Sequence, residues 1–471
     1  MRSFFIAIIT ITIVSLPLSA QVTTPLPHRE GPGEGLLSLQ QLKDSALHNN
    51  IAMRNARHSV DAAQQQRKEA FTKYFPTVSG TGTWFNANRG MAKMDVNPSE
   101  YISPELGAAL ATSLPAEALA ALGSPISVSM IKNGTIAGIN AVQPVFAGGQ
   151  IINGNKLAKI GEDVSRLQFQ LSENEVEKQT EQYYWQIVSL QEKLKTIAAV
   201  ETMLSDIHKD VDVAVRAGVA MRNDLLQVQL RQNNTESQKL KLQNGLSIVR
   251  LLLAQFCGLS SDSFTVSMGD AFAVASIPQP LGSAASLVEE QDHLQALLQT
   301  PEYQLLQKQV EAASLQKKMV IGQNLPTIAV GAGYNYHNLL DNNRTFGMIF
   351  ATVSVPISDW WGGSHAIKRK KIEYQKAIDE QHDKAQLLQI RMQTAWNSVV
   401  ESRLQLDIAQ RSIEQVEENL RLNRDYYRAG TTKMSDLLEA QLLYQQSLDR
   451  RTDAYADYQN KLLEYRQATG Q

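Results

Sequence analysis

The chain has very little cysteine and an uneven distribution of proline. Of its 471 residues only one is cysteine, Cys257, which excludes an intrachain disulfide framework and a zinc site built from paired cysteines. Its 15 prolines leave two long gaps, because none lies between Val145 and Ile277 and none follows Pro356. A compact mixed fold would rarely leave such stretches without proline, so we expect long helices there.

Neither sign of charge is in excess. Lysine and arginine number 45 and aspartate and glutamate 47, so the formal net charge is only −2. Nucleic-acid binding needs a strong basic excess, and we therefore expect no nucleic-acid partner. The chain also lacks GxxxxGK[ST], HExxH and GxSxG motifs, and its eight histidines are scattered. We therefore expect neither an enzyme nor a cofactor or metal site.

Long hydrophobic runs are absent beyond the N-terminus. Arg2, the apolar run Phe4–Leu16 and the small residue Ala20 predict a secretory signal peptide at residues 1–20. Residues 21–36 then have the composition of a flexible leader. No later segment approaches the roughly 18 unbroken apolar residues of a membrane-spanning helix. We expect an exported protein without a transmembrane helix.

Sequence landmarks recur along the chain in the same order. Phe75–Val78 returns 250 residues later as Leu325–Ile328, and the later landmarks return after 212 residues. The later pairs are Val142–Val145 and Ser354–Ile357, Arg216–Gly218 and Arg428–Gly430, and Asp224–Leu226 and Asp436–Leu438. The smaller second offset indicates an insertion in the first copy. We predict a duplicated unit, with a first repeat at 37–258, a linker at 259–283 and a second repeat at 284–471.

Each repeat is predicted to place a strand pair before a long helical hairpin. Ser38 and Gln41 form a capping box, period-two alternation indicates strands, and a 3-4 spacing of small and apolar residues from Ala385 to Tyr427 indicates a coiled-coil seam. At 1.5 Å per residue each hairpin would be about 100 Å long. The predicted elements are a helix from Ser38 to about Lys73, strands at about 76–85 and 135–145 with a proline-containing loop insertion at about 86–133, a hairpin at about 150–257, strands at about 326–338 and 345–356, and a hairpin at about 364–469.

The four predicted strands match outer-membrane barrel strands in length and alternation. Four strands cannot close a barrel, since about eight is the practical minimum, and an open sheet edge cannot lie in lipid with unpaired amides. Strands in a membrane would therefore require several copies of the chain. Trp360 and Trp361, followed by Lys368 and Arg369, suit a membrane interface. The alternative for these residues is a buried aromatic pair beside a solvated basic face.

Motifs at the strand-to-helix junctions and hairpin tips carry a resemblance to a known family. They are Leu39–Ala56, Gln143–Gly149, Val355–Ile357 with Trp361–Gly363, and the two Arg-Ala-Gly and Asp-Leu-Leu tips. With them the sequence resembles the TolC-like outer-membrane efflux and secretion channels from about Leu37 to the C-terminus. The resemblance implies a mainly α fold with a transmembrane β-barrel portion, in a homotrimer with a twelve-stranded barrel in the outer-membrane lipid of a Gram-negative cell and a twelve-helix tunnel in the periplasm. It also implies passive conduction for a periplasmic adaptor and an inner-membrane transporter.

By the same resemblance, the periplasmic entrance falls on six residues: Asp436, Glu439, Tyr427, Asp224, Thr432 and Lys433. Asp436 and Glu439 match acidic rings that narrow the entrance, and a trimer would place six carboxylates around one axis. Tyr427 and Asp224 match residues of the closed state. Thr432 occupies the position of the family's arginine, with Lys433 beside it as a candidate substitute. The alternative is that the acids stabilise a helix N-terminus and have no role in a pore.

The turns of the two hairpins are expected to dock the adaptor. The resemblance assigns this role to Gly218, Val219, Ala220, Gly430 and Thr431, whereas the alternative is a pair of helix C-caps; Ser435 with Asp436 is predicted to cap the returning helix. The alternative function is a periplasmic adaptor or a structural coiled-coil protein without a pore. An adaptor would carry one hairpin flanked by lipoyl-like halves, whereas this chain carries two hairpins, each after strands of membrane length.

Overall fold

A computed structural model of the chain describes residues 36–97, 102, 103, 106, 115, 126–259, 264–266, 290–339, 342–357 and 359–471. The predicted signal peptide, nearly all of the leader and most of the linker lie outside these residues. The chain divides into two compact units. Unit 1 comprises Met1–Asn50, Val176–Ala284 and Ser402–Asn460, and unit 2 comprises Ile51–Glu175, Ala285–Glu401 and Lys461–Gln471.

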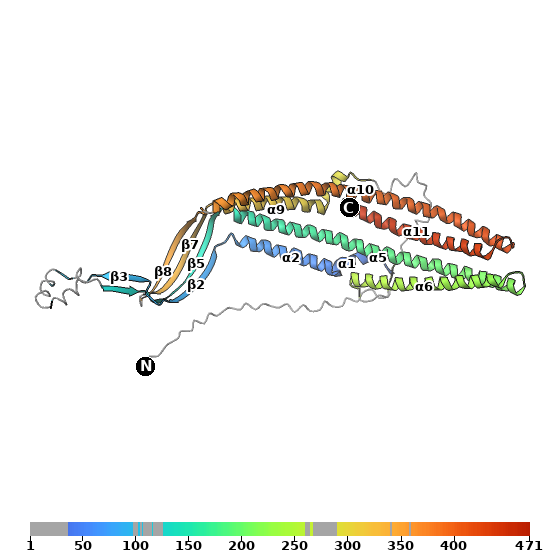
Figure 1. Ribbon diagram of the computed structural model, residues 1–471, viewed down its shortest axis with the longest axis horizontal. Coiled ribbons are helices and arrows are strands. Elements are labelled where there is room, and N and C mark those ends of the chain that lie inside the picture. Colours follow the sequence, from blue (N-terminus) through green and yellow to red (C-terminus); the bar gives the residue numbers. More distant parts are fainter. Residues whose placement is uncertain are drawn as a thin grey trace, which may run out of the picture. The chain divides into compact units, whose positions relative to one another are not determined.

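The described chain is mainly helical (Figure 1). Its helices are α1 (Leu39–Asn49), α2 (Ile51–Thr72), α5 (Gln150–Arg216), α6 (Arg222–Cys257), α8 (His293–Gln299), α9 (Pro301–Gln323), α10 (Asp359–Arg428) and α11 (Met434–Thr469). The two longest, α5 and α10, have 67 and 70 residues, which corresponds to about 100 Å each. None of the described helices combines the length and the apolar character needed to cross a bilayer.

The first predicted helix is divided in two. The capping box of Ser38 and Gln41 is present at the start of α1, as predicted. The helix breaks at Asn50, however, whose ψ of 138° is not helical, so the prediction of one helix to Lys73 is wrong. The side-chain amide of Asn50 donates a 2.9 Å hydrogen bond to the Phe256 carbonyl at the end of α6, and this contact stabilises the break. Cys257 beside it is buried, and burial raises the pKa of its thiol to about 12.

Unit 2 contains one antiparallel sheet of four strands, in the order β2-β5-β7-β8. The strands are β2 (Thr77–Asn86), β5 (Asn133–Ala147), β7 (Thr327–Leu339) and β8 (Asn342–Ser354). β2 and β5 come from the first repeat and β7 and β8 from the second, so the repeats join where β5 pairs with β7. In Figure 1 the four strands lie side by side and lead into α2, α5, α9 and α10.

Two shorter strand pairs were not predicted. Within the insertion interpreted as a loop, β3 (Ala92–Val96) pairs antiparallel with β4 (Ile126–Met130). The two strands flank the prolines that suggested a loop, because β3 ends before Pro98 and β4 begins after Pro125, so no proline interrupts the ladder. In unit 1, β1 (Leu36–Leu37) pairs parallel with β6 (Thr265–Val266), so the end of the predicted leader and part of the predicted linker form a small sheet.

The four-stranded sheet has one apolar and one polar face. The register aligns Val78, Ala141, Ala332 and Ile349 in one row across all four strands. Alternate residues on either side of that row form what we call the apolar face, and many of them are exposed in the chain: Val78, Trp84, Ile139, Tyr334, Ile349 and Val353. The opposite, polar face carries threonine, asparagine and glycine. Its apolar residues are Phe85, Ile136 and Val142 in the first repeat and Phe346, Met348 and Phe350 on β8, among others. Ile349 is 90 % exposed, so none of the described residues covers the apolar face there.

The two faces differ in crowding. A methyl group added to Gly333 on the polar face would lie 2.0 Å from Asn140 Oδ1, and one on Gly138 would lie 2.0 Å from Asn335 Oδ1. On the apolar face, a methyl group on Gly82 would meet nothing within 4 Å. The crowding comes from the cross-strand partners, because Asn140 and Asn335 lie directly opposite Gly333 and Gly138, whereas Gly82 on the edge strand β2 lies opposite the small Ala137.

The β5–α5 junction is packed directly against the end of α9. Gly148 has a φ of +58°, which favours glycine, and it follows the last residue of β5. A methyl group on Gly148 would lie 2.1 Å from the Gly322 carbonyl oxygen, and one on Gly322 would lie 2.2 Å from the Gly148 carbonyl oxygen. Two backbones in contact cannot give way as a flexible side chain can, so only glycine fits at Gly322.

We predict that Gly322→Ala destabilises the protein by about 1–3 kcal/mol, the range typical of overpacking a well-packed site. Gly82→Ala is the matched control, because its new methyl group meets open space and should change stability by no more than about 0.5 kcal/mol. Thermal unfolding of the detergent-purified variants, followed by circular dichroism, measures the difference. Equal melting temperatures for the two variants would contradict the close backbone contact.

Candidate functional site

The candidate site lies at the two hairpin turns of unit 1. We call residues 217–221, between α5 and α6, the first tip, and residues 429–433, between α10 and α11, the second tip. Gly218 and Gly430 have φ values of +75° and +74°, and in each tip the glycine and the following residue donate backbone hydrogen bonds back to the end of the helix. This is the Schellman pattern, so both tips are helix C-caps, as the alternative interpretation held. The docking role stays a prediction.

The first tip exposes apolar side chains. Val219 is 80 % and Met221 74 % exposed, which is more than most apolar residues of the chain. The second tip carries Thr431 and Lys433 at the corresponding places, and the Thr431 amide and hydroxyl both donate to the Tyr426 carbonyl. The two tips therefore share a backbone conformation and present different surfaces.

Asp224 and Asp436 lie at equivalent positions, because each is the third residue of its return helix, α6 or α11. Asp224 Oδ2 accepts a 3.2 Å hydrogen bond from the Met221 amide. Asp436 accepts hydrogen bonds from the hydroxyls of Thr432, at 2.8 Å, and Ser435, at 3.0 Å. The Thr432 bond is the main cause that holds the pKa of Asp436 below its ordinary value, followed by the Ser435 bond. Both aspartates thus stabilise a helix start.

Ser435 and Asp436 do not cap α11 in the way predicted. The helix begins at Met434, so both residues lie inside its first turn, and the amide of Asp436 bonds the Lys433 carbonyl. The hydroxyl of Thr432 donates to Asp436 instead. Lys433 is exposed and contributes least among the groups that lower the pKa of Asp436. Asp436 and Glu439 are both exposed on the first turns of α11.

A cleft of about 660 Å³ lies beside the tips. Six residues predicted from the sequence line it: Val219, Ala220, Asp224, Tyr427, Gly430 and Thr432. Burial raises the pKa of the Tyr427 phenol, and the negative charge of Asp224 raises it further. Asp436, Glu439 and Lys433 are not among the lining residues, so the structure separates the predicted entrance residues into a cleft group and an exposed group.

The cleft also contains charged residues that the sequence analysis missed. Asp210, Arg424 and Arg428 line it, and Arg428 Nη2 lies 3.9 Å from Asp210 Oδ2. Of these three residues, Arg428 could have been found from the sequence, because it is the first residue of the second Arg-Ala-Gly motif. Its counterpart Arg216 pairs with Asp212 of the same helix, so the duplicated arginines have different partners.

The predicted interface residues lie at the start of α10, in unit 2. Trp361 is 84 % exposed, so the alternative of a buried aromatic pair is wrong for this residue. The side chain of Trp360 is not among those that the structure describes. Lys368 and Arg369 are exposed, and Arg369 Nε lies 3.7 Å from Glu373 Oε1. Within the residues described, no group of three or more acidic, histidine or cysteine side chains is placed to hold a metal ion.

A hydrophobic cluster in unit 1 supports both tips. In it, Val228 of α6 and Met434 and Leu437 of α11 are at most 2 % exposed. Ile207 and Val211 of α5 are buried beside them. The first leucine of each Asp-Leu-Leu motif packs in or against this cluster, whereas Leu226, the second leucine of the first motif, is 52 % exposed. The motif therefore anchors the return helices below the tips.

We predict that Leu437→Ala loosens the tips, because truncating a buried leucine costs about 2–5 kcal/mol. Backbone amides near 205–228 and 420–440 should then exchange with deuterium much faster than in the parent protein. Leu226→Ala removes the same atoms from an exposed position and should leave exchange within about twofold, as expected for a surface substitution of about 0.5 kcal/mol or less. Similar exchange in the two variants would show that the cluster does not hold the tips.

Comparison with known proteins relates this architecture to one family. The sequence profile of a family described as outer membrane efflux protein matches residues 42–259 and 294–471. No curated protein sequence matches the chain. Among solved structures, CusC is similar, with a TM-score of 0.73, 15 % identity and 92 % of each chain covered.

Two further solved structures have the same fold. VceC of Vibrio cholerae has a TM-score of 0.69 and 14 % identity, with 92 % of this chain and 96 % of VceC covered. The open state of MtrE, the outer membrane channel of Neisseria gonorrhoeae, has a TM-score of 0.67 and 15 % identity, with 92 % of this chain and 88 % of MtrE covered. At these identities the structures establish the fold alone.

Proposed function

Because the chain belongs to the outer membrane efflux protein family, we propose that it is the outer-membrane channel of a tripartite efflux or type I secretion system. The observation that carries this proposal is the four-stranded sheet, which exposes apolar side chains on one face and carries threonine, asparagine and glycine on the other. An apolar outside and a polar inside are the requirements of a membrane barrel with a wet lumen.

The sheet needs further copies of the chain to form that barrel. β2 and β8 are the edges of the described sheet, and unpaired edge amides are not tolerated in hydrocarbon. We propose that β8 of one copy pairs with β2 of the next in a homotrimer, so that three sheets of four strands close a twelve-stranded barrel. The number of copies follows from the family, and the need for copies follows from the open edges.

The helices would then form the periplasmic part of the channel. We propose that α2, α5, α9 and α10 of three copies enclose a tunnel, with the tips of unit 1 at its entrance. The channel conducts passively, and an inner-membrane transporter supplies the energy. A periplasmic adaptor docks at the tips, where the exposed Val219 and Met221 offer apolar contact.

The exposed acids of α11 are proposed to select and hold cations at the entrance. In a trimer, Asp436 and Glu439 would contribute six carboxylates around one axis, and their repulsion and affinity for cations follow from Coulomb's law. The cleft group of Asp224, Tyr427 and Thr432, with Arg428 and Asp210, would control closure. The adaptor or structural coiled-coil alternative does not account for an uncovered apolar sheet.

We predict that Asp436→Ala with Glu439→Ala raises single-channel conductance in planar lipid bilayers and weakens block by divalent cations. Glu414→Ala with Glu417→Ala is the matched control, because it removes two exposed acids with the same spacing from α10. The control should conduct like the parent protein. An unchanged conductance and block in the first variant would refute the acidic ring, and a parent protein without any conductance would refute the channel.

We also predict a pH dependence of this block. The hydroxyls of Thr432 and Ser435 hold the pKa of Asp436 below its ordinary value, so the carboxylate stays charged to a lower pH than it would without them. Divalent block should therefore persist to a lower pH than in a protein that lacks these hydrogen bonds. Thr432→Val removes the main cause of the shift, and block should then disappear at a higher pH. A midpoint that does not move would show that Asp436 is not the blocking group.

A further inference from the structure

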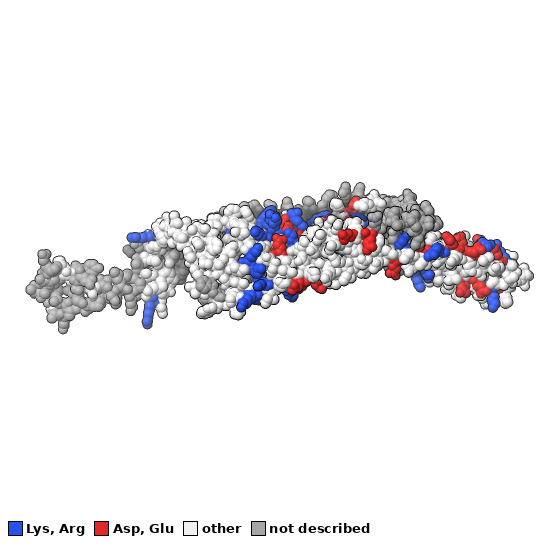
Figure 2. Space-filling view, turned by 90° about the horizontal axis from the view of Figure 1, so that it is seen from above, with Lys and Arg blue, Asp and Glu red and all other residues white. Residues whose placement is uncertain are grey.

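Three helices of unit 2, α5, α9 and α10, carry only basic charge in the turns next to the sheet, whereas the last turn of α2 contains Glu69 after Arg67 and Lys68. Residues 150–161 of α5 contain Lys156 and Lys159 and no acid, and residues 312–323 of α9 contain Lys317 and Lys318 and no acid. Residues 360–372 of α10 contain four consecutive basic residues at 368–371 and no acid. Figure 2 shows lysine and arginine side chains gathered in a band on the helices next to the sheet.

A groove of about 690 Å³ between α2 and α5 runs through this band. Its character changes along its length. Toward the sheet it is lined by Phe71 of α2, by Tyr74, which lies between α2 and β2, and by Ile152 of α5, which are 55 %, 40 % and 51 % exposed. Farther from the sheet it is lined by basic residues: Arg67 and Lys68 of α2, and Lys156, Lys159 and Arg166 of α5.

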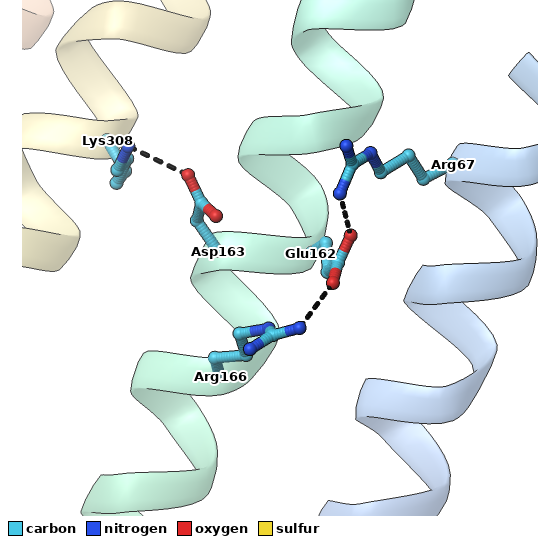
Figure 3. A network of polar contacts seen from close by, with 5 residues as sticks. All are labelled: Arg67, Glu162, Asp163, Arg166 and Lys308. Atoms are coloured by element: carbon cyan, nitrogen blue, oxygen red, sulfur yellow. Dashed lines mark hydrogen bonds and ion pairs between the residues drawn. The ribbon is translucent and has the colours of Figure 1, made fainter. Parts of the chain in front are cut away.

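The one acid in the groove is already neutralised. Glu162 is buried, and its carboxylate accepts hydrogen bonds from Arg67 at 2.9 Å and Arg166 at 2.7 Å (Figure 3). Two guanidinium groups on one carboxylate leave an excess positive charge, and these bonds hold the pKa of Glu162 below its ordinary value. The neighbouring Asp163 pairs away from the groove, with Lys308 of α9 at 2.9 Å.

Three lysines of the groove, Lys68, Lys156 and Lys159, are free cations. All three are exposed, and in the part of the chain that is described none of them forms an ion pair. Lys156 and Lys159 lie one turn apart on α5, and Ile152 lies one turn nearer the sheet. At 1.5 Å per residue, about 10 Å along the helix separates Ile152 from Lys159, which is short enough for one amphipathic molecule to span.

We propose that this groove binds the phosphate headgroup of an anionic membrane phospholipid. The phosphate lies against Lys156, Lys159 and Lys68, and the glycerol and first acyl carbons lie against Phe71, Tyr74 and Ile152, directed toward the apolar face of the sheet. A soluble anion would use the cations alone, whereas the aromatic and aliphatic lining favours a molecule with a hydrocarbon end. The proposal rests on the proposed membrane location of the sheet and adds a specific lipid partner.

The test is lipid binding to the full chain, purified in detergent and delipidated, measured by native mass spectrometry. The protein should retain phosphatidylglycerol in preference to phosphatidylcholine. Lys156→Gln with Lys159→Gln should weaken phosphatidylglycerol retention about fivefold for each lysine removed, the contribution typical of a basic residue at an anionic surface. Lys376→Gln with Lys384→Gln is the control, because it removes the same charge from exposed positions of α10 outside the groove.

Three results would overturn the proposal. The first is equal retention of the two lipids, and the second is an equal loss of retention in the groove variant and the control. The third is displacement of the lipid by glycerol phosphate at the same concentration as by phosphatidylglycerol, which would identify a site for soluble anions. The conductance of the groove variant in planar bilayers should equal that of the parent protein. Lack of conductance in the parent protein would therefore refute the channel, while the lipid preference is measured independently of it.

Discussion

The pairing of β5 with β7 is the constraint on which the rest of this structure depends. It joins the two repeats in one sheet, and its register decides which side chains share a face. Because side chains alternate along a strand, a slip of one residue would move every apolar side chain of one repeat to the polar side. The pairing contains one irregularity, between Pro144 and Phe146, which places Phe146 opposite Ile328 on the apolar face. A bulge there accommodates a proline that has no amide to donate.

The duplication supplies two equivalent tips that have diverged in chemistry. Both end in a left-handed glycine, and both return helices have an aspartate in the first turn. Asp224 lines the cleft and acts on Tyr427, whereas Asp436 is exposed and is held by Thr432 and Ser435. A capping role and a role at an entrance are compatible, because a capping carboxylate keeps a free oxygen face and its charge. Because the chain belongs to the outer membrane efflux protein family, a test of the entrance role says more about function than a test of the capping role.

Along the groove between α2 and α5, apolar side chains lie nearer the sheet and basic side chains lie farther from it. Phe71, Tyr74 and Ile152 lie close to the sheet in sequence, and basic residues follow within about three turns of helix. Such an order matches the hydrocarbon core and headgroup layers of a bilayer. Under the proposed function, Trp361 at the start of α10 would lie at the same boundary, so the proposed barrel, interface residues and lipid groove require one and the same membrane position.

The sequence by itself determined the elements that depend on local periodicity and on punctuation by glycine and proline. The helical hairpins, the four long strands and the turns at Gly218 and Gly430 follow from spacing, and the duplication follows from landmarks at constant offsets. Local patterns could not reveal the break at Asn50, which depends on a bond to Phe256, or the strand pair β3–β4 inside a proline-containing segment. Only the tertiary structure brought Asp210, Arg424 and Arg428 to the cleft and joined α2 to α5 around Glu162. These contacts link residues far apart in the chain. Which residues meet depends on how the helices pack together, and the spacing of residues within one helix does not determine that.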